Sequence, residues 1–307
     1  MNNKLIHLFM KRITATLFVP FYLFLFSTIG NAQYVNYGSP SKEIQNISKN
    51  DIFVVMTGNK IFDAAFKSAV EKNWKLSKSV KTIKAGDIED YLKNENNYFI
   101  APVDFFFGTG NTMVLLDSKG VTPQTDVVKM QDKNLVVFNG KYSKVLKQNS
   151  KTVIATVPFI INNSDNYVPM LDYMVKAVND GIDLVMKNNL QGKEMEQGVY
   201  AASRKNSSVL KAKTLVLPNG SFSGSGDLKR YKYKNEYKSG AEINKLLTDA
   251  DKNYCVLCYC VNTPGNCKSI YIYDLETKSI IYASFTPNAK DPGFEDMVLL
   301  NNSVEGK

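Results

Sequence analysis

Four cysteines are the residues in this chain whose type and spacing could most directly do chemistry. Cys255, Cys258, Cys260 and Cys267 are the only cysteines among 307 residues, and they fall within thirteen positions as C-x₂-C-x-C-x₆-C. Thiolates at such spacing can hold a metal ion or form a redox pair. The residues between the first three are apolar or aromatic, however, as in a β-strand, whose side chains alternate between two faces. Cys258 and Cys260 would then share one face and Cys255 the other, so we expect no metal site.

A β-hairpin accounts for the cysteines better. The segment 261–266 contains Pro264-Gly265 and is typical of a turn, and 267–273 would return as the next strand. Cys260 and Cys267 would face each other at the mouth of this loop, which predicts a disulfide bond between them. We expect Cys255 and Cys258 to be buried as small hydrophobic residues.

Other candidates for chemistry are weaker. His7 is the only histidine and lies in the first thirty residues. The rest of the chain therefore has no histidine for a catalytic triad or an imidazole metal site. The run from Asp249 lacks the glycine and glutamate of a calcium loop, and 224–226 lacks most of a phosphate-binding loop. The adjacent acids 89–90 and 295–296 favour solvated surfaces. We therefore assign no catalytic, cofactor-binding or metal residue, and no cofactor.

The amino terminus predicts export. Residues 1–32 combine a basic start, an apolar run over 13–26 and small residues at Gly30 and Ala32, the three parts of a secretory signal. The apolar run is shorter than the roughly 20 residues that span a bilayer. We expect cleavage after Ala32, a periplasmic or secreted location, and no transmembrane segment in the mature chain.

The charge of the remaining chain does not favour nucleic acid as a partner. Residues 33–307 hold 35 basic and 29 acidic residues, a formal charge of +6, and only Arg204 and Arg230 among the basic residues are arginine. Bidentate recognition of phosphate or guanine favours arginine over lysine. Lysines spread along the chain instead indicate a solvated surface.

Hydrophobic periodicity predicts an α/β or α+β protein of two related modules with mixed sheets and packed helices, joined by a long helix. We expect an irregular segment over 33–50 and a first module over 51–190 that ends in a helix at about 165–190. A loose boundary over 191–212 and a smaller second module over 213–307 complete the prediction.

The two modules show a weak internal repeat. Ile88 corresponds to Ile243 and Leu92 to Leu247 at an offset of 155, and the pair Gly110-Asn111 corresponds to 265–266 at the same offset. The shared unit would be a helix, a strand, a Gly-Asn turn and a second strand. Chance similarity between two α/β segments is the alternative.

The runs 53–74 and 270–278 resemble uncharacterised secreted proteins of Bacteroidota-type Gram-negative bacteria, which implies an envelope location and no particular activity. The strand–helix–strand order of the first module is also similar to the amino-terminal domain of the Tol translocation protein and to curli-secretion lipoproteins, a likeness of fold that carries no function. The leading hypothesis is a non-enzymatic module that binds an envelope protein or a small ligand. The alternative is a secreted enzyme that uses carboxylates or a divalent metal without histidine.

Overall fold

The first sheet starts with the strand that the apolar run after residue 50 predicts. In the computed structural model, β1 (Asp51–Met56) is buried along most of its length and leads into the 14-residue helix α3 (Lys60–Asn73). The side chain of Asn59 caps α3, and Asp63 accepts hydrogen bonds from the backbone N–H groups of Thr57 and Gly58. The Asn59 side-chain oxygen therefore satisfies the first N–H groups of α3, and the Asp63 carboxylate satisfies those of the turn that precedes the helix. The structure describes residues 41–106, 112–115, 133–139, 153–158, 168–221, 230–262, 267–286 and 293–307.

Six strands form this first sheet. Their order is β2-β1-β3-β5-β6, with β4 also paired to β3. The first three strands of that order are parallel, whereas β5 and β6 run antiparallel to their neighbours. The strands that follow β1 are β2 (Ser79–Lys84), β3 (Tyr98–Phe106), β4 (Thr112–Leu115), β5 (Lys133–Asn139) and β6 (Val153–Pro158).

The second sheet repeats this arrangement. Its order is β8-β7-β9-β10-β11, with β8, β7 and β9 parallel and the last two strands antiparallel to their neighbours. The order and the directions match those of β2-β1-β3-β5-β6 in the first sheet, which confirms two related modules of mixed sheet. Its strands are β7 (Thr214–Pro218), β8 (Asn235–Lys238), β9 (Tyr254–Asn262), β10 (Cys267–Asp274) and β11 (Ile280–Thr286).

One correspondence in the expected repeat needs correction. The sequence offset equates the strand after Gly110-Asn111 with the strand that begins at Cys267, that is, β4 with β10. Val103 of β3 pairs with both β4 and β5, so these two strands lie on opposite edges of β3, and β4 lies on the side of β1. β10 instead lies on the edge of β9 away from β7. The topological counterpart of β10 is therefore β5, and β4 is an addition to the first module.

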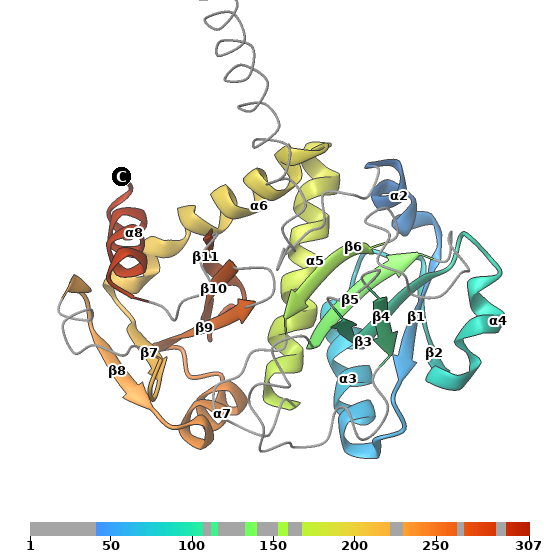
Figure 1. Ribbon diagram of the computed structural model, residues 1–307, viewed down its shortest axis with the longest axis horizontal. Coiled ribbons are helices and arrows are strands. Elements are labelled where there is room, and N and C mark those ends of the chain that lie inside the picture. Colours follow the sequence, from blue (N-terminus) through green and yellow to red (C-terminus); the bar gives the residue numbers. More distant parts are fainter. Residues whose placement is uncertain are drawn as a thin grey trace, which may run out of the picture. The chain divides into compact units, whose positions relative to one another are not determined.

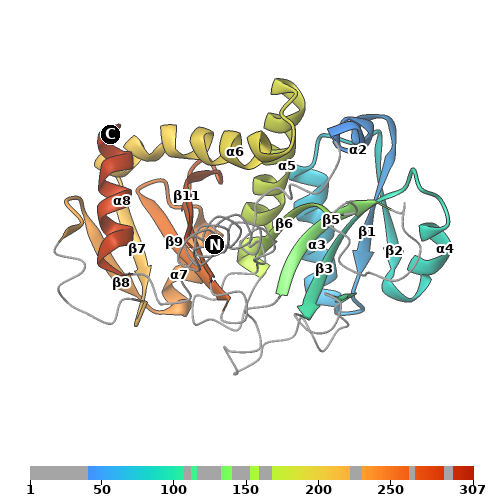
Figure 2. The ribbon, with the colours of Figure 1, turned by 45° about the horizontal axis from the view of Figure 1, so that its top comes forward.

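The helix α5 (Leu171–Asn188), which follows η5 (Val168–Met170), connects the modules as predicted. It lies between the two sheets (Figures 1 and 2) and its side chains are buried on most sides, in one core shared with both sheets. The Tyr173 hydroxyl donates a hydrogen bond to the Leu247 carbonyl, and its ring packs edge-on against Tyr273. Asp172 forms ion pairs with Lys72 and Lys278, at 2.8 and 2.5 Å. Because α5 contacts both modules, all the described residues belong to one compact unit.

Helices also cover the outer faces of the sheets. On the first sheet, η3 (Ala85–Asp87) and α4 (Ile88–Leu92) place two apolar residues over Phe53 and Phe99. On the second sheet, the outer core lies beneath α8 (Phe294–Glu305), while α7 (Gly240–Asp249) contributes to the central core. The N-cap residue of α7, Ser239, forms a reciprocal capping box with Glu242 that fixes the start of this helix.

Two segments in which no helix was expected contain helices. Part of the segment 33–50 forms α2 (Ser41–Asn46) and η2 (Ile47–Lys49), with Ile44 and Ile47 fully buried. The boundary expected over 191–212 holds α6 (Lys193–Lys205) and η6 (Ser207–Lys211). These helices are short, so tertiary packing rather than local propensity stabilises them, and the sequence pattern missed both.

Candidate functional site

The side chains that form the candidate site come from α6, η6 and the end of α8. In α6 the buried residues Met195, Val199 and Ser203 recur every four positions and face the rest of the protein. Glutamates in its first turn and Arg204 and Lys205 in its last turn match the helix dipole. Arg204 and Lys205 therefore stabilise the helix, whether or not they also bind a ligand.

Hydrogen bonds of Arg204 join the end of α6 to β11 and to η6. Its Nε donates to the backbone carbonyl of Ala283 at 3.4 Å, and its own carbonyl accepts a hydrogen bond from the Ser207 hydroxyl at 2.7 Å. The Ser207 and Ser303 hydroxyls are 2.9 Å apart, which joins η6 to α8. The end of α6 and the last turns of α8 are thus held side by side.

A buried ion pair holds the other end of α8. The Lys268 ammonium on β10 lies 2.5 Å from the Asp296 carboxylate in the first turn of α8, and their exposed fractions are 4% and 5%. Asp296 also accepts a hydrogen bond from the backbone N–H of Gly293 at 2.8 Å. This contact corrects the expectation that the acids 295–296 are both solvated, because the alternation of β10 turns Lys268 toward the helix.

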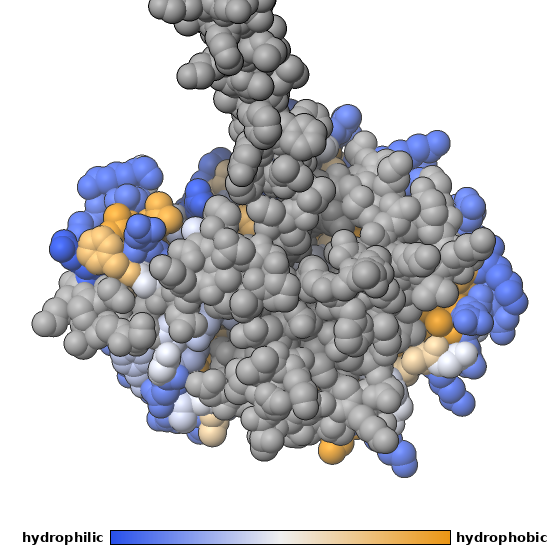
Figure 3. All heavy atoms as spheres, in the orientation of Figure 1, coloured by the Kyte–Doolittle hydropathy of each residue, from blue (hydrophilic) through white to orange (hydrophobic). Residues whose placement is uncertain are grey.

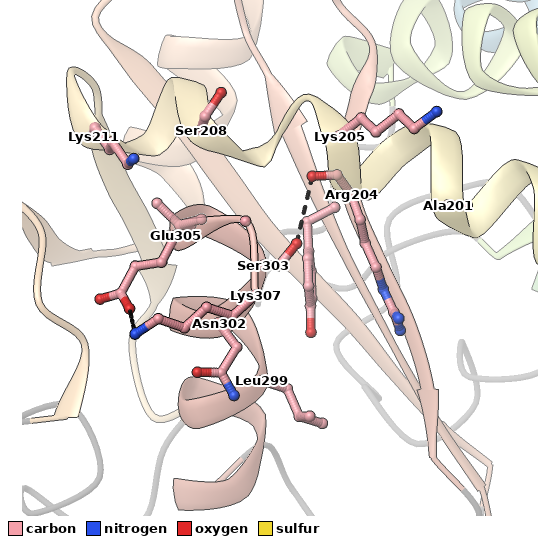
Figure 4. A pocket seen from close by; sticks show the side chains of 13 residues that line it. Ala201, Arg204, Lys205, Ser208, Lys211, Leu299, Asn302, Ser303, Glu305 and Lys307 are labelled. Carbon is pink, nitrogen blue, oxygen red and sulfur yellow. Dashed lines mark hydrogen bonds and ion pairs between the residues drawn. The ribbon is translucent and has the colours of Figure 1, made fainter.

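Between these elements lies a cleft of about 560 Å³, drawn in Figure 4. The side chain of Arg204 extends beside the end of α8, whereas that of Lys205 extends away from it. The volume is within the usual range of small-molecule sites, roughly 300–1,000 Å³. The cleft is lined by Ala201, Arg204, Lys205, Ser208, Lys211, Tyr282, Leu299, Asn302, Ser303, Val304, Glu305, Gly306 and Lys307.

The charge of the cleft is positive. Of the charged side chains that line it, Arg204, Lys205, Lys211 and Lys307 are cationic and Glu305 alone is anionic. Glu305 is bound by Lys307 at 2.6 Å and by Lys232, and these hydrogen bonds lower its pKa to about 2. Within the part of the chain that the structure describes, the ion pairs include no carboxylate partner for Arg204, Lys205 or Lys211. Their charge is available to an anion.

Tyr282 lies on the floor of the cleft and is 2% exposed. Burial raises the pKa of its phenol, an effect that the Ser284 hydrogen bond and the positive charge of Arg204 partly offset. The phenol is therefore neutral at physiological pH and is unsuited to act as a base. A smaller hollow of about 160 Å³ between α5, α6 and the start of β11 is lined mainly by apolar and neutral polar side chains.

The cysteines divide as the strand pattern predicts. Cys255 and Cys258 are fully buried, with Cys255 in the core beneath α8 and Cys258 in the central core, on opposite faces of β9. Burial, followed by the nearby Asp274 carboxylate, raises the pKa of Cys255 to about 12. A thiol with this pKa is a poor nucleophile at neutral pH.

The expected hairpin is present, with a register that differs in detail. β9 and β10 are antiparallel, but Cys260 is paired with Ser269 and Cys267 with Asn262. The two cysteines are therefore offset diagonally rather than directly opposite. Their side chains lie outside the described part of the structure, so the disulfide between Cys260 and Cys267 stays a prediction.

The described residues contain no group of three or more histidine, cysteine, aspartate or glutamate side chains placed to hold a metal ion. None of the described helices has both the length and the apolar character needed to cross a bilayer.

Comparison of the chain with protein-family models, curated proteins and solved structures finds no match. Sequence reasoning missed the cleft because α6 was not predicted, and without that helix the lysines near residue 205 resemble any other solvated lysines. The only available signal was Arg204, one of two arginines after the expected cleavage site.

Proposed function

We propose that this protein is an exported, non-enzymatic binding module of the cell envelope that holds an anionic ligand in the cleft between α6, η6 and α8. The observation that carries the proposal is that Arg204, Lys205 and Lys211 line a cleft of small-molecule size and have no carboxylate partner among the described residues. Opposite charge supplied by a ligand would neutralise them.

The geometry of Arg204 supports this role. Its Nε is already bonded to the Ala283 carbonyl, so the position of the guanidinium is partly fixed before a ligand arrives. The remaining guanidinium N–H groups can donate two parallel hydrogen bonds to a carboxylate or a phosphate. Preorganisation of this kind reduces the entropy lost on binding.

The chemistry of the cleft supports binding rather than catalysis. Its neutral polar groups are the hydroxyls of Ser208, Tyr282 and Ser303 and the amide of Asn302, and the described residues that line it include no histidine or cysteine. The one acidic side chain in the lining, Glu305, has a pKa of about 2 and is held by two lysines, so it is a weak base at neutral pH.

Isothermal titration calorimetry with inorganic pyrophosphate at low ionic strength tests the proposal. The variant with Arg204→Gln and Lys211→Gln should bind at least about tenfold more weakly, since each charged contact contributes roughly 1 kcal/mol or more. The matched control has Lys60→Gln and Lys84→Gln, which remove the same charge from the first module, where both lysines are exposed. Equal loss in both variants would mean that only net charge matters, and the cleft would not be a site.

A further inference from the structure

The helices α5 and α8 hold equivalent places in the two modules. α5 follows the last strand of the first sheet, and α8 follows the last strand of the second. In each helix one buried asparagine accepts a hydrogen bond from the segment that joins the first two strands of its module. Asn179 accepts from the backbone N–H of Lys75 at 2.9 Å, and Asn301 accepts from that of Lys232 at 3.3 Å. These contacts align the two helices with a shift of 122 positions in the sequence.

The burial of neighbouring side chains agrees with this alignment. The residues before the two N–H donors are both buried aromatics, Trp74 and Tyr231. α8 turns three buried apolar side chains toward the second sheet, and the aligned positions of α5 are also apolar and buried. The aligned sets are Val175, Val178 and Ile182 in α5 and Met297, Leu300 and Val304 in α8.

The side of α5 that faces away from the first sheet is covered by the second module. The Tyr173 hydroxyl donates a hydrogen bond to the Leu247 carbonyl of α7 at 3.1 Å. One turn further along α5, Ala177 is fully buried. Asp180 follows on the same side and accepts a hydrogen bond from the Ser279 hydroxyl at 3.3 Å. This side of α5 is therefore the contact that joins the modules within the chain.

The aligned side of α8 is exposed. Its residues are Glu295, Leu299 and Asn302, which are four and three positions apart and so share one side of the helix. All three are exposed, and 49% of Leu299 is accessible to solvent. Figure 3 shows orange surface among blue at the place that α8 occupies in Figure 1. α8 thus presents to solvent the side that α5 buries against a module.

The surface that receives α5 has a counterpart in the first module. Ile243 and Leu247 of α7 are buried at the positions that align with Ile88 and Leu92 of α4. α4 lies over the face of the first sheet opposite to α5, in the core around Phe53. Figures 1 and 2 both place α4 and α8 at opposite ends of the pair of modules. Each copy of the chain therefore carries both halves of the contact that its own modules make.

We propose that the exposed side of α8 docks on the α4 side of the first module of a second copy, so that the contact between modules is repeated between chains. The two surfaces are different, so the contact is head-to-tail and leaves one surface of each kind open at the ends of every dimer. Association then continues as the concentration rises, unless the chains close into a ring. Leu299 also lines the cleft, so a docked copy would border it, but the proposal does not depend on an anion in the cleft.

The alignment also predicts one ion pair between the chains. Glu295 takes the place of the tyrosine that reaches the end of α7, so in the docked pair it would lie beside the end of α4, at Leu92. Lys93 follows Leu92 and its side chain is 73% exposed. Its partner within the chain is Asp90, whose side chain is 78% exposed, and exposed pairs of this kind contribute little to stability. Lys93 can therefore turn to Glu295 of the second copy.

A second copy fits this surface better than other occupants. A different protein would need a module of the same kind, whereas every copy of this chain already carries one. A small anion in the cleft would leave Glu295 exposed, because Glu295 does not line the cleft.

Sedimentation velocity of the processed protein, recovered from exporting cells, tests the proposal over a range of concentrations. We expect the mean sedimentation coefficient of the wild type to rise with concentration. Glu295→Lys places two lysines at the contact and Lys93→Glu places two glutamates there, so each variant alone should associate at least about tenfold more weakly. An equimolar mixture of the two variants should associate again, because unlike molecules then bring opposite charges together. Rescue by mixing would also show that both variants are folded.

The matched controls are Glu71→Lys and Lys67→Glu, which reverse the charges of an exposed pair on α3, with side chains 56% and 52% exposed. Both controls should associate like the wild type. A wild-type protein that stays monomeric at every concentration would overturn the proposal. So would variants and controls that weaken association equally, or variants that mixing does not rescue.

Pyrophosphate affinity separates this proposal from the proposed function. Neither Glu295 nor Lys93 lines the cleft, so both variants should bind pyrophosphate as the wild type does. A monomer that binds pyrophosphate would overturn the docking of a second copy and support the proposed function. Association that mixing rescues, without pyrophosphate binding, would support the docking and overturn the proposed function.

Discussion

The buried ion pair between Lys268 and Asp296 offers a quantitative test of how α8 is held against the second sheet. Replacing Lys268 by methionine keeps most of the side-chain volume and leaves the Asp296 carboxylate buried without its cation. Removal of one partner from a buried pair costs about 3–5 kcal/mol. The Gly293 N–H still bonds to Asp296, so we expect about 3 kcal/mol, the lower end of this range.

Urea unfolding at pH 7, monitored by circular dichroism, measures this loss. The urea concentration at half-unfolding should fall, while the slope of the unfolding free energy against urea concentration stays constant. The double variant with Lys268→Met and Asp296→Asn should recover at least half of the lost free energy, because no unpaired charge is then buried. The control is Lys245→Met, which breaks the exposed pair of Lys245 with Asp249 on α7 and should cost less than about 0.5 kcal/mol. If the Lys268 and Lys245 variants lose the same free energy, the Lys268 pair is solvated and the account of α8 is wrong.

Three further predictions concern other parts of the chain. Burial raises the pKa of Glu196 to about 7, a shift that the neighbouring Tyr200 side chain partly opposes, so the native state binds a proton that the unfolded state releases above pH 4.5. This contribution to stability is present below pH 4.5 and is lost as pH rises to 7; Glu196→Gln should remove roughly 1 kcal/mol of that pH dependence in urea titrations, a figure reduced because Glu196 is partly exposed. Non-reducing peptide mapping should find Cys260 linked to Cys267, and all four thiols reactive in the native protein would contradict the disulfide. Amino-terminal mass spectrometry of the exported protein should begin at Gln33, and a Met1 form as the mature species would refute the signal.

Much of the fold follows from hydrophobic periodicity. The apolar runs that become β1, β3 and β9 and the long stripe of α5 are strong signals, because the apolar side chains described in each element are nearly all buried. The repeat was visible through Ile88 and Ile243, whose helices precede equivalent strands. Its last strand was misassigned because the extra strand β4 follows a Gly-Asn pair at the same offset.

The elements that form the cleft were the ones that sequence patterns could not reveal. α6 has polar residues on most of its surface; of its apolar residues, Met195 and Val199 are buried in the core and Tyr200 packs against it. The partner of Lys268 lies 28 residues away in sequence, and only the packing of α8 on β10 brings them together. A cleft between separate elements depends on such tertiary contacts, which no local motif encodes.

The most direct test of the central claim is an NMR titration of the isotopically labelled protein with inorganic pyrophosphate. The account predicts saturable shifts of backbone amides at Arg204, Lys211, Ser303 and Lys307, with the first module unchanged. Shifts spread over the exposed lysines of both modules, or none at the end of α8, would contradict it.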